Sequence, residues 1–121
     1  MNPNDTLDIG RGFTIKNRSC LAAMTNKQSN DDGTLSDKEI TWLARRAKGG
    51  FAITTTAAAN VVEKGRGWEG EMGVWGDHQL PGLTKLATQL NSHQTISLVQ
   101  LFHGGMRAPR EIAATEAPIP K

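Results

Sequence analysis

The chain has 121 residues, of which 37% are hydrophobic, 21% charged and only 5% aromatic, so it forms one domain at most (residues 1–121) and is neither collagen-like nor low in complexity. A net charge of +2 is too small to indicate nucleic-acid binding, and no apolar run approaches the roughly 18 residues that a membrane-spanning helix needs. The polar N-terminus lacks the layout of a signal peptide and the single cysteine, Cys20, cannot form an internal disulfide, so we expect a cytoplasmic protein.

The first predicted elements lie at the N-terminus. Residues 7–9 and 13–15 are typical of a β-hairpin, because the connection Gly10-Arg11-Gly12 offers glycines at positions where a tight turn needs positive φ. A continuous apolar run follows at residues 20–24 and ends at Thr25. Such a run, without alternation, is typical of a strand that is buried on both faces.

The next segment predicts a helix. Ser36 is placed to cap its N-terminus, and Glu39, three residues further on, completes a capping-box pattern. Apolar residues then recur at helical spacing until Gly49-Gly50 ends the helix; they are Ile40, Leu43, Ala44 and Ala47.

Two strands and one helix follow. Residues 51–57 and 96–101 have the composition of strands, and a helix is expected between them from about Pro81. The alternation of strands and helices predicts an α/β fold with a parallel sheet and right-handed crossovers. Ligands of such sheets bind at the carboxyl ends of the strands, so the polar residues that follow each strand are candidates for a site.

Two other motifs are weak. Residues 65–70 match G-x-G-x-x-G, but no helix begins directly after them and no acidic residue follows about 20 positions later, so a dinucleotide-binding turn is disfavoured. Cys20 and the three histidines lack the spacing of metal ligands, so no metal site is predicted.

Gln100 lies at the end of the last predicted strand, one residue before Leu101. Its amide offers donors and an acceptor, so it can pair at two points with a flat heterocycle such as a flavin pyrimidine ring, or bond the backbone of a nearby loop. Thr25 similarly caps the next turn or contacts a cofactor. The His103 imidazole and the Arg107 guanidinium follow Gln100 on a glycine-containing loop, either as contacts for an anionic substrate or as solvated side chains.

Several segments, in order along nearly the whole chain, resemble the Old Yellow Enzyme family of FMN-dependent NAD(P)H oxidoreductases and ene-reductases. Each segment is modest alone, and the set is specific. They are TIKNR at 14–18, AAMTN at 22–26, DGTLSD at 32–37, RAKGGF at 46–51, GWEGEMG at 67–73, PGL at 81–83 and VQLFHGGMR at 99–107.

The resemblance implies a fold and a cofactor site. The fold would be the N-terminal part of a (β/α)₈ barrel, about three β/α units preceded by a hairpin, with FMN at the carboxyl ends of the strands. It places the backbone of Ala23 and Met24 against the flavin ring, Thr25 near its O4 and N5 atoms, Ala58 at its border and Gln100 at its pyrimidine edge. The family usually has proline where this chain has Ala23.

The resemblance also implies a reaction. NAD(P)H would reduce FMN, which would then pass hydride to an activated C=C bond or a related acceptor. The family's substrate-binding histidine pair is expected beyond Lys121, and the chain has no tyrosine to donate a proton, so no catalytic residue is assigned. Three hypotheses remain: a subunit completed by a second chain or by self-association, an inactive truncated fragment, or a binding or scaffold module.

Overall fold

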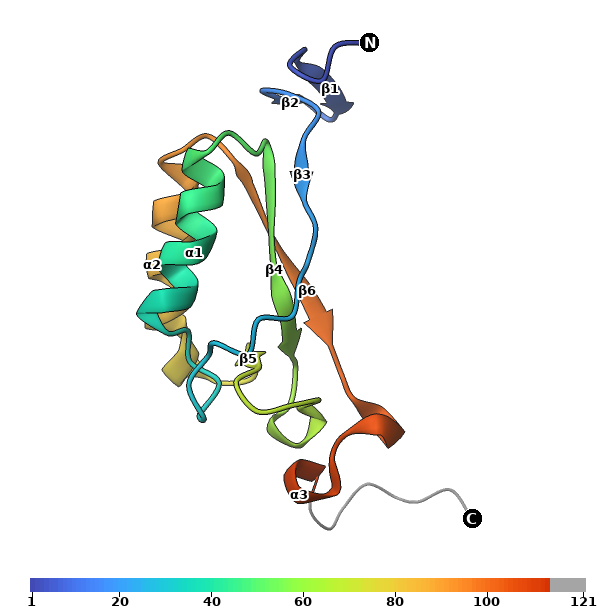
Figure 1. Cartoon of the computed structure of the whole chain (residues 1–121), viewed down its shortest axis with the longest axis vertical. Coiled ribbons are helices and arrows are strands. Elements are labelled where there is room, and N and C mark those ends of the chain that lie inside the picture. Colours follow the sequence, from blue (N-terminus) through green and yellow to red (C-terminus); the bar gives the residue numbers. More distant parts are fainter. Residues whose placement is uncertain (114–121) are drawn as a thin grey trace.

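A computed structural model describes residues 1–113 (Figure 1). The predicted hairpin is confirmed: β1 (Leu7–Gly10) and β2 (Phe13–Ile15) pair antiparallel. Gly10 and Gly12 have φ angles of +88° and +82°, which a residue with a side chain rarely adopts. The glycines of the turn therefore have the role that the sequence predicts.

A parallel sheet forms the centre of the molecule. Its middle strand, β4 (Ile53–Asn60), pairs along one edge with β6 (Ile96–Phe102). Its other edge is shared by two short strands, β3 (Cys20–Leu21) near the start of β4 and β5 (Met72–Gly73) at its end. All three pairings are parallel, as the sequence predicts for β3, β4 and β6; β5 was not predicted.

The strand boundaries differ from those expected. The apolar run at residues 20–24 forms only the two-residue β3, because β4 pairs with it only at Ile53 and Thr54. The strand expected at 51–57 instead spans 53–60. Three alanines in a row (Ala57–Ala59) have low intrinsic strand propensity, but all three are buried, Ala58 and Ala59 pair with β6, and Ala59 also pairs with β5.

Helices cover one face of this sheet (Figure 1). The two main ones, α1 (Asp37–Lys48) and α2 (Leu80–Asn91), lie side by side. Shorter helical segments sit in the connections: η1 (Glu63–Gly65), η2 (Asp77–Gln79), η3 (Gly105–Arg107) and α3 (Arg110–Ala113). None of the helices in the described part of the chain is long and apolar enough to cross a membrane.

Only one of the two hydrogen bonds of the predicted capping box forms at the start of α1. The Ser36 hydroxyl accepts a hydrogen bond of 3.2 Å from the backbone N–H of Glu39, as predicted. The second half of the predicted capping box is wrong, because the Glu39 carboxylate contacts Asn26 and Ser29 instead. Its side chain links the helix to the preceding loop rather than to its own N-terminus.

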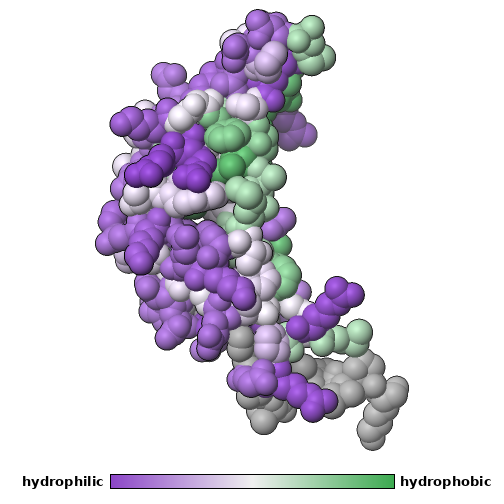
Figure 2. Space-filling view, in the orientation of Figure 1, coloured by the Kyte–Doolittle hydropathy of each residue, from purple (hydrophilic) through white to green (hydrophobic). Residues whose placement is uncertain are grey.

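The hydrophobic core lies between the helices and the sheet. It contains Leu21, Leu35, Ile40, Leu43, Ala47, Ala59, Met72, Leu86 and Leu90. No described helix covers the other face of the sheet (Figure 1). Leu98, Val99 and Leu101 of β6, which alternate between the two faces, are 45%, 45% and 67% exposed. Figure 2 shows hydrophobic residues gathered over the strands beside the hydrophilic surface of the helices.

Truncation of a core leucine tests this arrangement. Leu43→Ala removes a side chain that is 1% exposed, so we expect the free energy of unfolding to fall by about 2–5 kcal/mol. The same change at the half-exposed Leu98 is the control and should cost clearly less. Denaturant titration measures both values, and equal losses would contradict the assignment of the core to the helix side.

Candidate functional site

The carboxyl ends of the parallel strands meet at one end of the sheet (Figure 1). There the ladder between β4 and β6 places Ala58 directly opposite Gln100, and Asn60 opposite Phe102. Partners in a parallel ladder project to the same face of the sheet. Two residues that lie 42 positions apart and that the sequence assigns to one ligand are thus neighbours.

The side chain of Gln100 is exposed and available for a ligand. Its backbone N–H donates a hydrogen bond of 3.4 Å to the Thr56 hydroxyl, but its amide bonds no other residue within 1–113. The alternative in which Gln100 bonds the backbone of a loop is therefore absent from this part of the chain. Beside it, Ala58 is only 6% exposed and offers a small apolar surface.

The segment that follows β3 approaches the same end of the sheet along the other edge of β4 (Figure 1). Leu21 pairs with Thr54, so Thr25 and Ala58 both lie four residues beyond a paired position. Ala23 is half-buried, whereas Met24 and Thr25 are exposed. The structure thus brings this segment and the Ala58–Gln100 pair to the same end of the sheet. Their contact with a cofactor stays a prediction.

A buried carboxyl group, which the sequence did not predict, holds a loop at this end of the sheet. Glu71 is 1% exposed and one of its oxygens, Oε2, accepts a hydrogen bond of 2.6 Å from the backbone N–H of Gly67. Its other oxygen, Oε1, has no hydrogen-bond partner in the described residues. Burial raises the pKa of Glu71 above its ordinary value, against the lowering effects of the Gly67 N–H and the Arg66 charge.

Glu71 directly precedes β5. Met72, the next residue, pairs with Ala59 in the β4–β5 ladder, so Glu71 lies where the chain enters the sheet. The loop that Glu71 holds also carries Trp68, whose ring lies 5.2 Å from that of Phe102. The sequence carries no signal for this role, because no strand was predicted next to Glu71.

The loop after β6 folds back on the same region. The N–H of Gly104 donates to the Gly65 carbonyl at 2.7 Å, and the His103 imidazole accepts a bond from Gly105 at its Nδ1 atom. His103 and Arg107 are both exposed. Their role as contacts for an anionic substrate stays a prediction. Residues 1–113 contain no group of three or more His, Cys, Asp or Glu side chains that could hold a metal ion.

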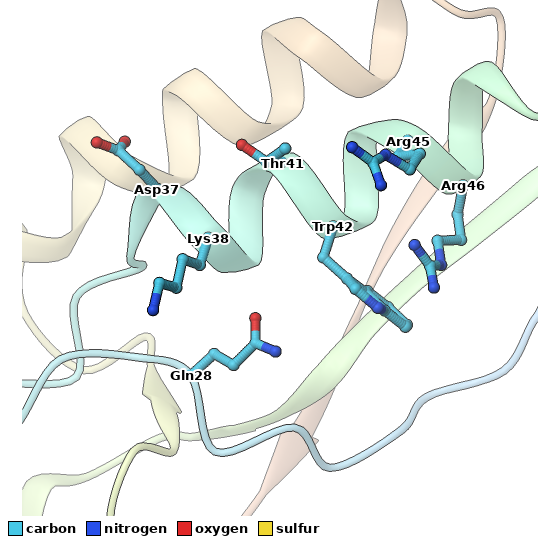
Figure 3. A pocket seen from close by; sticks show the side chains of 7 residues that line it. All are labelled: Gln28, Asp37, Lys38, Thr41, Trp42, Arg45 and Arg46. Carbon is cyan, nitrogen blue, oxygen red and sulfur yellow. The ribbon is translucent and has the colours of Figure 1, made fainter.

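Two surface hollows lie in the helix layer and contain none of the predicted site residues. One, of about 420 Å³, is lined by Gln28, Asp37, Lys38, Thr41, Trp42, Arg45 and Arg46 (Figure 3). In it the Arg46 guanidinium lies 4.0 Å from the centre of the Trp42 ring. The other, of about 610 Å³, lies between α1 and α2 and includes Arg45, Lys48 and His93.

Comparison with known proteins identifies the class. Residues 5–120 match the NADH:flavin oxidoreductase / NADH oxidase family, and the chain belongs to this family. It is 38% identical over 101 residues to the probable NADH-dependent flavin oxidoreductase YqiG of Bacillus subtilis, covering 84% of this chain and 27% of that protein. It is 36% identical over 110 residues to an NADPH dehydrogenase of Listeria welshimeri, covering 88% and 32%.

Solved structures agree on the fold. A 2-naphthoyl-CoA reductase in complex with 2-naphthoyl-CoA superposes with a TM-score of 0.86 at 32% identity, over 94% of this chain and 17% of that chain. An Old Yellow Enzyme homologue from Zymomonas mobilis gives 0.86 at 22% identity, over 97% and 32%. The predicted fold, an N-terminal part of a (β/α)₈ barrel, is confirmed. The chain spans about a third or less of the length of these relatives.

The predicted cofactors are confirmed at the level of the family. The matched family is one of flavin oxidoreductases, and the two relatives carry the names of NADH- and NADPH-dependent enzymes. FMN with NAD(P)H is thus the cofactor set of the family to which this chain belongs.

The raised pKa of Glu71 predicts a pH dependence of stability. Protonated Glu71 suits its buried position, so its contribution to stability is present at low pH and is lost as pH rises from about 4.5 through the folded-state pKa. We expect Glu71→Gln to remove this loss and to gain stability relative to wild type as pH rises. Urea titrations between pH 4 and 8 (roughly the range in which shifted carboxyl groups titrate) measure the difference.

The control for this experiment is Glu69→Gln, which neutralises an exposed carboxylate of the same loop. It should show a clearly smaller pH-dependent difference from wild type. A stability difference between Glu71→Gln and wild type that stays constant with pH, or that shrinks as pH rises, would contradict the raised pKa.

Proposed function

We propose that this chain forms the N-terminal FMN-contacting wall of an NAD(P)H oxidoreductase that reduces activated C=C bonds or related acceptors. The observation that carries the proposal is the pairing of Ala58 with Gln100, with the Gln100 amide free of hydrogen bonds to described residues. A free amide beside a small apolar residue, at the carboxyl end of a parallel sheet, suits the edge of a flat heterocycle.

The chain's residues fit the cofactor in distinct ways. Gln100 can donate to a carbonyl oxygen and accept from an adjacent N–H, which is the pattern along the pyrimidine edge of a flavin. Ala58 would border the planar ring, where its small side chain leaves room, and the backbone of Ala23 and Met24 would lie against the ring. The exposed Thr25 hydroxyl bonds none of the described residues and is available to the ring. FMN, when bound, supplies the hydride chemistry, and these residues bind and orient it.

Catalysis also requires polypeptide outside these 121 residues. This chain covers only 27% of the relative from Bacillus subtilis, and it has no tyrosine to serve as a proton donor. We propose that a second chain, or association between copies of this one, completes the sheet. The support is β6, which pairs only with β4 in the described part of the chain and exposes Leu98, Val99 and Leu101.

The exposed strand also favours a second candidate function, a binding or scaffold module without redox chemistry. The two candidates differ in flavin binding, which a scaffold does not need. The free, exposed Cys20 suits a reducing compartment, so the proposed location is the cytoplasm.

Gln100→Ala tests the assigned contact. Loss of two hydrogen bonds to the pyrimidine edge should raise the Kd for FMN about tenfold or more. Fluorescence quenching of FMN on titration with protein measures the Kd. Gln89→Ala, which removes the same amide from the hollow between α1 and α2, is the matched control and should bind FMN as wild type does. Equal affinity of the Gln100 and Gln89 variants would refute the role of Gln100, and a wild-type chain that binds no FMN would favour the scaffold.

A further inference from the structure

The loop between β3 and α1 is held by a buried carboxylate. Glu39, in the first turn of α1, is 0% exposed. Its Oε1 atom accepts a hydrogen bond of 3.0 Å from the Asn26 side-chain amide, and its Oε2 atom accepts one from the Ser29 hydroxyl. Both donors lie in the loop that directly follows Thr25, so a single side chain ties this loop to the rigid helix.

These contacts organise the whole loop. Asn26 is in turn the acceptor for the backbone N–H of Gln28 at 3.1 Å, and Lys27 has a φ of +51°. The Ser29 N–H donates to the Gly70 carbonyl at 3.1 Å. A side chain at Gly70 would come within 2.7 Å of the Lys27 carbonyl oxygen, so the two loops touch backbone to backbone. Glu39 thus fixes one loop, against which the loop carrying Glu71 packs.

The N-terminal cap of the helix does not use this carboxylate. Ser36 already accepts the Glu39 N–H at the N-terminus of α1, and the Glu39 side chain turns away from that terminus. In residues 1–113 the carboxylate forms no ion pair; both of its partners are neutral donors in the loop. Burial of a polar group is costly unless it is hydrogen-bonded, and both oxygens of Glu39 are bonded to the loop. The Glu39 side chain therefore stabilises the loop.

We propose that Glu39 is a positioning residue of the cofactor site: through Asn26 and Ser29 it holds the loop that fixes Thr25 where the flavin ring is contacted. The effect on the loop stands on the hydrogen bonds alone, and the effect on flavin rests on the proposed function. Glu39 touches neither cofactor nor substrate; it acts through the loop.

Amide hydrogen exchange, followed by NMR on the full chain, tests the loop. Glu39→Ala should speed exchange of the Gln28 and Ser29 amides about tenfold or more relative to the Leu43 amide in the middle of α1. Glu39→Gln keeps an acceptor oxygen and should fall between Glu39→Ala and wild type. Ser36→Ala, which weakens the same end of the helix but spares the carboxylate, is the matched control and should leave these amides protected.

Ser29→Ala removes one of the two bonds without disturbing α1, and it should loosen the loop even if Glu39→Ala does not fold. Unchanged protection of the Gln28 amide in Ser29→Ala and Glu39→Gln would overturn the proposal. Equal loss of protection in Ser36→Ala would overturn it as well, because the effect would then belong to the helix terminus.

Titration with FMN tests the proposed effect of Glu39 on flavin binding. In Glu39→Ala the Kd for FMN should rise and the absorption spectrum of bound FMN should differ from that of wild type, with Glu39→Gln partly restoring both. Wild-type binding with an identical spectrum and Kd in the Glu39 variants would contradict the link to the flavin. A wild-type chain that binds no FMN would instead count against the proposed function and against the flavin half of this inference, and the exchange result would still decide the loop.

Discussion

The parallel ladder between β4 and β6 is the interaction on which the site depends. It runs from Ile53 opposite Ile96 to Asn60 opposite Phe102, with a register shift between Thr55 and Ala58, and it aligns two segments that are separated by the whole of α2. A one-residue slip would turn Gln100 away from the face that Ala58 shares, because side chains alternate along a strand. The core residues of α1 and α2 hold this register by covering one face of the sheet.

Two buried carboxyl groups then shape the loops at the carboxyl ends of the strands. Glu39 holds the loop after β3 through side-chain donors, and Glu71 holds the loop before β5 through a backbone N–H. The two loops meet where Ser29 donates to the Gly70 carbonyl. Loops without regular hydrogen bonding need such anchors to place residues accurately, and here the anchors come from a helix and from the edge of the sheet.

The sequence predicted the elements well because their signals are local. The hairpin glycines, the Ser36 cap and the helical spacing of Ile40 and Leu43 each act within a few residues. Pairing is not local, so the boundaries were less accurate: β4 extends to Asn60 because its alanines are held between β5 and β6, which propensity does not reveal.

The distinction between local and long-range interactions also applies to the site. Family resemblance singled out Thr25, Ala58 and Gln100, and the structure places them at one edge. Neither buried carboxyl group was assigned a site role from sequence. Glu39 had a local interpretation as part of a capping box, which the long-range contact to Asn26 overrides. Glu71 lies in a glycine-rich stretch whose folding depends on the sheet, so its burial has no signature in the neighbouring residues.

An NMR titration of the chain with FMN tests the central claim most directly, because it maps the cofactor onto the surface without assuming any residue's role. Chemical-shift changes concentrated at Ala23–Thr25, Ala58 and Gln100 are the result this account predicts. Changes concentrated instead along the helix layer, at Thr41, Arg45 and His93, would contradict the assignment of the flavin site to the carboxyl ends of the strands.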